Sequence, residues 1–76
     1  MVSYFNVIKD GKNLMLENID GDVIPVPIEF RKHVYSARKN NMAIRLPDDH
    51  SKTSFIRLVS IEDFNTYKDD KLKINK

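Results

Sequence analysis

The residue types that most often perform chemistry are sparse in this 76-residue chain. Asp48-Asp49-His50 is a local cluster whose two carboxylates and imidazole could bind a divalent ion. Three consecutive loop residues rarely converge on one ion, so we expect a polar loop and no metal site. The other histidine, His33, lies beside a basic stretch and is expected on the surface.

Other signatures of catalysis are missing from the sequence. There is no cysteine, two glycines cannot form a Gly-rich phosphate loop, and no serine lies in a G-x-S-x-G context. We therefore predict a binding protein that is not an enzyme and that uses no cofactor and no small-molecule substrate.

The basic side chains concentrate in one stretch, although the net charge is only +2. Residues 28–46 carry five basic side chains and one acidic side chain, whereas residues 1–27 sum to −2 and residues 47–76 to zero. Such clustering is typical of a surface for phosphate or an acidic partner, and also of a solvated helix face. The candidate binding residues are the cations of this stretch and one aromatic between them that could stack on a base: Arg31, Lys32, Tyr35, Arg38, Lys39 and Arg45.

A β-hairpin is predicted at the start of the chain. Residues 2–8 are rich in β-branched and aromatic side chains, and Asp10-Gly11 follows, a dipeptide that favours a two-residue type I′ turn. This turn would pair residues 2–8 with residues 13–17 and set Val7 opposite Leu14.

A second turn is predicted at residues 20–22, Asp-Gly-Asp. A three-residue loop there would set Ile19 opposite Val23 and begin a third strand over residues 23–27. Two prolines, Pro25 and Pro27, cannot donate hydrogen bonds to a neighbouring strand, so this strand is expected at a sheet edge.

The basic stretch predicts a short helix over residues 28–39. Phe30, Val34 and Ala37 recur at helical spacing and predict the buried stripe. Asn40-Asn41 is expected to end the helix, because asparagine tolerates the left-handed backbone conformation.

The remaining chain predicts two strands and a second helix. Strands are expected over residues 42–46 and 53–59, and a helix over residues 61–68 with Ser60 as its N-cap. The fold class is therefore α+β, in the order β-β-β-α-β-β-α with mostly antiparallel pairing. We expect one domain over residues 1–68 and a frayed or disordered tail over residues 69–76.

One segment resembles a known family. The string Val26-Pro27-Ile28-Glu29-Phe30-Arg31-Lys32 is similar to the strand end and helix start of the swapped-hairpin DNA-binding proteins, the AbrB and MazE-like antitoxins. The likeness covers about residues 12–59. It implies an interlaced homodimer in which each chain completes the partner's barrel, which would also enlarge a small core.

The sequence departs from that family where its members carry DNA-binding arginines on the strands around the first turn. Those places hold Leu16, Glu17, Asn18 and Asp22, and the carboxylates of Glu17 and Asp22 would repel phosphate. Only Arg31 and Lys32 match the family's basic positions.

Two functions follow as alternatives. The first is a dimeric DNA-binding transcriptional regulator or antitoxin-like module, with the cations on phosphate and Tyr35, Asn40 or Asn41 toward the bases. The second is a small accessory protein of the phage or plasmid type, which binds and inhibits a host protein through a strand edge or the basic helix. Neither a signal peptide nor a membrane-spanning run is evident, so a cytoplasmic protein is expected.

Overall fold

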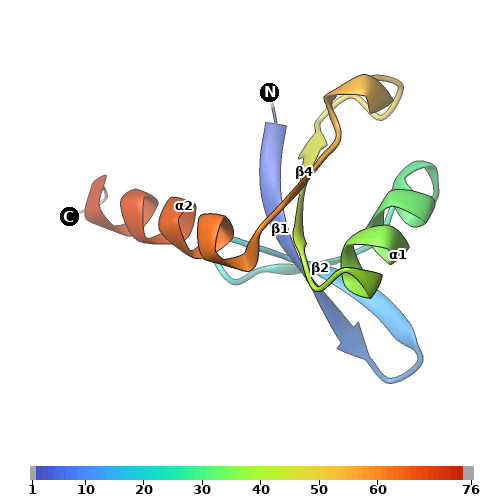
Figure 1. Cartoon of the computed structure of the whole chain (residues 1–76), viewed down its shortest axis with the longest axis horizontal. Coiled ribbons are helices and arrows are strands. Elements are labelled where there is room, and N and C mark those ends of the chain that lie inside the picture. Colours follow the sequence, from blue (N-terminus) through green and yellow to red (C-terminus); the bar gives the residue numbers. More distant parts are fainter. Residues whose placement is uncertain (1, 75–76) are drawn as a thin grey trace.

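The chain forms a five-stranded antiparallel sheet with two helices (Figure 1). The computed structural model describes residues 2–74, and of residues 71–74 it describes the backbone alone. The predicted α+β class and order of elements are confirmed. The elements are β1 (Val2–Asp10), β2 (Asn13–Asn18), β3 (Val23–Pro25), the 3-10 helix η1 (Ile28–Phe30), α1 (Arg31–Lys39), β4 (Ala43–Pro47), the 3-10 helix η2 (Thr53–Phe55), β5 (Arg57–Val59) and α2 (Ile61–Ile74).

The sheet has the strand order β3-β2-β1-β4-β5. Three of its four pairings join strands that follow one another along the chain, and the fourth joins β1 to β4 across the helical segment. Strand β3 lies at one edge, as predicted from its prolines, and β5 lies at the other.

The first hairpin forms where it is predicted, but with a different register. Val7 pairs with Leu16 instead of Leu14, and the two-residue loop is Gly11-Lys12 instead of Asp10-Gly11. Gly11 has φ of 62°, whereas Lys12 is not among the residues with positive φ. A type I′ turn needs positive φ at both central residues, while a type II′ turn needs it only at the first, which is where Gly11 lies.

The second turn also shifts the register by two residues. Glu17 faces Val23, a position predicted for Ile19. Gly21, with φ of 90°, ends the loop, as in three-residue loops that close with a left-handed residue. The side-chain oxygen of Asn18 accepts hydrogen bonds from the backbone N–H groups of Asp20 and Asp22, both at 2.9 Å, and so fixes the loop from inside.

The predicted helix over residues 28–39 is confirmed, with its first turn as the 3-10 helix η1. Its end is a complete Schellman motif, because the N–H of Met42 donates to the carbonyl of Ala37 (2.8 Å) and that of Asn41 to Arg38 (3.2 Å). Asn41 has φ of 55°, the left-handed conformation expected of it.

The stretch predicted as one strand over residues 53–59 is only half strand. Residues 53–55 form η2, and β5 is confined to Arg57–Val59. The N–H of Ile56 bonds to the carbonyl of Thr53 in this turn, so residues 53–55 do not extend the ladder with β4. This part of the prediction was wrong because apolar side chains at both parities do not distinguish a strand from a short turn.

The second helix is longer than predicted. The hydroxyl of Ser60 accepts a hydrogen bond from the N–H of Asp63 at 3.0 Å, which confirms the N-cap. The helix continues to Ile74 and not to residue 68, so most of the stretch expected to fray is helical. Residues 75–76 of that predicted tail lie outside the described residues.

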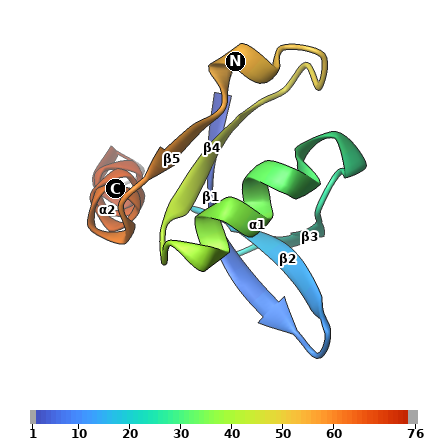
Figure 2. The same ribbon diagram turned by 45° about the vertical axis from the view of Figure 1, so that its right-hand side comes forward.

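The two helices lie on opposite faces of the sheet (Figures 1 and 2). The face toward α1 holds the main core, in which Phe30, Val34 and Ala37 are 0–1% exposed, as predicted. The same core contains four buried residues of β1, β2 and β4: Val7, Leu16, Ile44 and Leu46. On the other face, Phe64 of α2 is buried and Tyr67 stacks on Tyr4 with ring centroids 4.0 Å apart.

Candidate functional site

The exposed face of α1 gathers five of the six predicted binding residues. Because successive residues rotate by about 100° around a helix, they occupy an arc of about 120° opposite the buried Val34 and Ala37. All five side chains are exposed, with Tyr35 near the middle of the arc: Arg31, Lys32, Tyr35, Arg38 and Lys39. We call this group the α1 basic face.

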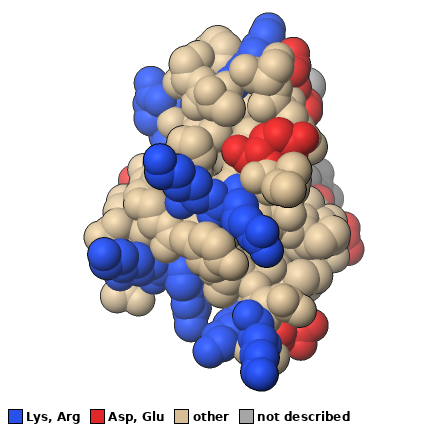
Figure 3. All heavy atoms as spheres, turned by 90° about the vertical axis from the view of Figure 1, so that its right-hand side faces the viewer, with Lys and Arg blue, Asp and Glu red and all other residues tan. Residues whose placement is uncertain are grey.

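The α1 basic face contains no carboxylate, since α1 has no acidic residue. In Figure 3, which looks onto the side of the molecule that carries α1, Lys and Arg spread over the centre and lower part, while most Asp and Glu lie toward the right. The positive charges of this face are therefore not neutralised from within the helix.

The first turn of α1 runs against the usual electrostatics of helices. Arg31 and Lys32 lie in the first turn of α1, near the positive end of the helix dipole, where cations are unfavourable, and the acidic residue of this end, Glu29, lies in the preceding turn η1. The N-cap residue Phe30 provides no side-chain hydrogen bond either. By contrast, Arg38 and Lys39 in the last turn are stabilising. Arg31 and Lys32 gain no stabilisation from the dipole of α1, so their exposed position is compatible with a binding role.

A groove lies beside the α1 basic face, between α1 and the β2–β3 hairpin. It has a volume of about 350 Å³, and two members of the basic face, Arg31 and Tyr35, line it. This groove was not predicted from the sequence. The one feature of the sequence that pointed to the groove is Ile28, an apolar residue just before the buried stripe. In the structure Ile28 is 78% exposed. The other lining residues come from both walls: Asn13, Leu14, Met15, Pro25, Val26 and Val34.

Arg45, the sixth predicted residue, lies elsewhere. Its neighbours on β4, Ile44 and Leu46, face α1, so alternation directs Arg45 to the opposite face of the sheet. There its Nε and Nη2 atoms donate to the carbonyl oxygen of Phe55, at 3.2 and 3.0 Å. Arg45 therefore ties β4 to η2 and does not join the other candidate residues.

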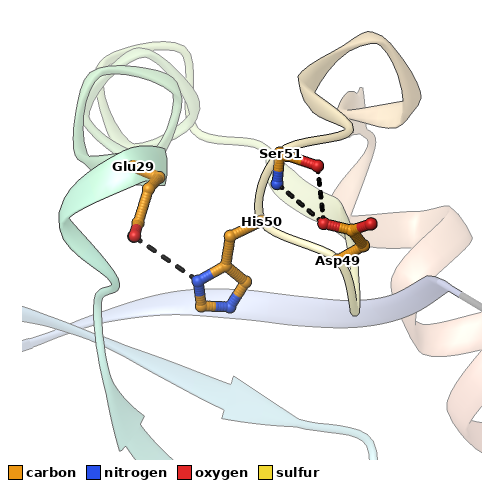
Figure 4. Close-up of polar contacts among 4 residues, drawn as sticks. All are labelled: Glu29, Asp49, His50 and Ser51. Carbon is orange, nitrogen blue, oxygen red and sulfur yellow. Dashed lines mark hydrogen bonds and ion pairs between the residues drawn. The ribbon is translucent and has the colours of Figure 1, made fainter.

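Within the predicted cluster Asp48-Asp49-His50, the side chains of Asp49 and His50 turn in different directions (Figure 4). The Oδ1 atom of Asp49 accepts hydrogen bonds from the hydroxyl and the N–H of Ser51, at 2.7 and 3.0 Å, and these bonds lower the pKa of Asp49 below 3.8. His50 turns toward the preceding helix, with its Nδ1 atom 3.4 Å from a carboxylate oxygen of Glu29. No group of three potential metal ligands occurs within the described part of the chain.

Three further residues that the sequence singled out lie in α1 or at its end. His33 is half-buried instead of on the surface, and its Nδ1 atom is buried without a hydrogen-bond partner. Asn40, which was considered for base contacts, donates from its side-chain amide to the carbonyl of Ser36 at 2.9 Å. Asn41, considered with it, is exposed at the end of α1, where its left-handed backbone ends the helix.

Tyr67 and Tyr4 form the main polar contact of the face that α2 covers. The Tyr67 hydroxyl donates a hydrogen bond to Tyr4, and this bond, followed by the electrostatic effect of Tyr4, raises the pKa of Tyr67 above its usual value. Both effects favour the neutral phenol of Tyr67, which stacks on the Tyr4 ring.

In the region from residue 2 to residue 74, no helix combines the length and apolar character needed to cross a bilayer. The chain was compared with models of protein families, with curated proteins and with solved structures, and none of the three comparisons finds a match.

Proposed function

We propose that this chain binds nucleic acid through the α1 basic face, as a regulator or antitoxin-like module of the kind that the resemblance at residues 26–32 implies. The observation that supports the proposal is the exposed arc of four cations on α1, a helix that itself contains no carboxylate. Basic side chains on one helix face are suited to contacts with successive phosphates.

The proposed contact set is smaller than the sequence suggested. Arg31, Lys32, Arg38 and Lys39 contact phosphates, and Tyr35 approaches the bases between them. Arg45 is left out, because its guanidinium is engaged with Phe55 on the other side of the sheet. The interlaced homodimer implied by the resemblance stays a prediction, to be measured alongside binding.

Binding should depend steeply on salt. Four phosphate contacts give a slope of log affinity against log salt of about −3.6 on duplex DNA, or roughly a hundredfold loss between about 50 and 200 mM. The experiment is fluorescence anisotropy of a labelled generic duplex at both salt concentrations, with light scattering on the same samples to determine the oligomeric state.

The decisive variant is Arg31→Gln/Lys32→Gln, for which we expect the slope to fall by about two. Its matched control is Lys52→Gln/Lys68→Gln, which removes the same charge from the β4–β5 loop and α2. Equal losses in the two variants, or no binding to duplex or single strands at low salt, would contradict the proposal.

A protein partner is the second candidate function, and strand β5 is the observation that favours it. This edge strand pairs only with β4, and two of its three residues are apolar and half-buried, Leu58 and Val59. An extended segment of a host protein could add to this edge as a further strand. Inhibition of such a partner would then be weakened by Leu58→Pro, which removes a ladder donor, and would be insensitive to Arg31→Gln/Lys32→Gln.

A further inference from the structure

We infer that the nucleic acid recognised by this chain is single-stranded, with an unstacked base seated in the groove beside Tyr35. This inference rests on the proposed function and names its substrate class. It is based on two neighbouring features, the α1 basic face and the groove that Tyr35 helps to line.

The groove suits a planar, partly apolar group. Its volume of about 350 Å³ lies within the range of pockets that bind small organic molecules. Residues of β2 and of the segment after β3 form one wall, among them Leu14 and Val26. Ile28 and Tyr35 form the other.

Tyr35 is positioned as a stacking platform. It is 52% exposed, so its ring can meet a ligand without displacing the core. Arg31 precedes it by four residues and Lys39 follows it by four, so both lie next to it on the helix surface. Phosphates held by these cations would place the intervening base over the ring, which is the arrangement that single-strand binding proteins use.

Four other aromatic side chains are engaged in packing within the fold. Phe30 and Phe64 are buried, and Tyr4 and Tyr67 stack on each other on the far side of the sheet. Tyr35 is thus the aromatic residue that borders both the groove and the cations.

A duplex would leave these features unused. Bases in a duplex are stacked and paired, so their ring faces cannot reach Tyr35, and the exposed Ile28 would face charged phosphates. A single strand supplies phosphates for the α1 basic face and a free base for the groove. The same cations therefore bind both, but only the single strand gains stacking.

The experiment compares three labelled probes of equal length at about 50 and 200 mM salt: oligo-dT, a duplex, and an abasic oligonucleotide that keeps the phosphates and lacks the bases. We expect oligo-dT to bind more tightly than the other two. Tyr35→Ala should weaken oligo-dT binding by about 5- to 150-fold, the value of one stacked base, and leave abasic binding unchanged. Tyr35→Phe should retain oligo-dT binding, because it keeps the ring.

The matched control is Phe55→Ala, which removes an aromatic side chain of similar exposure, 49%, from η2. It should leave all three affinities unchanged. The inference is overturned while the proposed function stands if the duplex binds as tightly as oligo-dT with a salt slope that falls in Arg31→Gln/Lys32→Gln. Loss of abasic binding in Tyr35→Ala, equal to the loss of oligo-dT binding, would also overturn it, since stacking would then not be the cause. Absence of binding to all three probes at low salt would remove the proposed function itself.

Discussion

The two faces of the sheet are covered in different ways. On one face, η1 and α1 together bury three side chains that are 0–1% exposed, and these belong to a core cluster of eight buried residues. On the other face, α2 buries Phe64 and rests Tyr67 against Tyr4, while the far part of the helix extends away from the sheet (Figure 1). We therefore expect the α1 face to contribute more to the stability of the fold than the α2 face.

The same comparison applies to the surfaces. The exposed side of α1 carries four cations and no carboxylate, whereas α2 begins with Glu62 and Asp63, which suit the positive end of its dipole. The carboxylates at the start of α2 therefore stabilise that helix, whereas the cations in the first turn of α1 do not stabilise theirs. Ligand binding is expected where charge and helix stability conflict.

The largest expected effect separates the two layers. Phe30→Ala removes a ring that is 1% exposed in the main core and should lower the free energy of unfolding by about 3–5 kcal/mol, a large share of the total for so small a domain. Phe64→Ala should cost less, at the lower end of that range, because fewer elements surround it. Urea denaturation followed by circular dichroism measures both. A larger loss for Phe64→Ala would reverse the comparison.

A smaller effect should stay within α2. Ser60→Ala removes the acceptor for the N–H of Asp63 and should cost about 1 kcal/mol, with helix loss confined to residues 61–74 in amide hydrogen exchange. Ser36→Ala is the matched control on the exposed side of α1, where alanine should leave stability unchanged or slightly higher. Loss of protection in the sheet on Ser60→Ala would show that α2 is integral to the fold.

The smallest effect concerns the β4–β5 loop, which contacts the α1 side through His50 and Glu29. The pKa of Asp49 is lowered by its hydrogen bonds to Ser51, so the folded state prefers the carboxylate. The stabilisation is present above pH 3.8 and is lost as the pH falls through the lower pKa of the folded state. Asp49→Asn should reduce the slope of stability against pH in this acid range, with a small loss of stability at pH 7 that disappears at the acid end. An unchanged acid slope, measured by thermal unfolding, would contradict this role.

Local signals predicted most of the fold. The Asn41 helix end, the Ser60 cap and the stripe of Phe30, Val34 and Ala37 depend on a few neighbouring residues, so the sequence contains all of their causes. The registers were harder, because each turn offers several residues and the position of the positive-φ glycine decides which loop forms. Both errors were shifts of two residues in the partner strand, which keep Val7 and Leu16 on one face and therefore keep the core.

The site was predictable only in part. Helical periodicity was sufficient to group Arg31 with Lys39, since both belong to one helix. Arg45 could not be separated from them by sequence, because its direction depends on which face of the sheet α1 covers. The groove was also beyond prediction, since it arises between α1 and a hairpin whose register was not known.

The pairing of β1 with β4 has a consequence for how the chain reaches this structure. Phe5 lies opposite Ile44, about 40 residues further along the chain, whereas the other strand pairs close short loops. Closing the long loop costs the most chain entropy. The meander of β1 to β3 and the β4–β5 hairpin should therefore form first, and β1 should pair with β4 afterwards. The rate of folding should then be governed by the pairing of these two central strands.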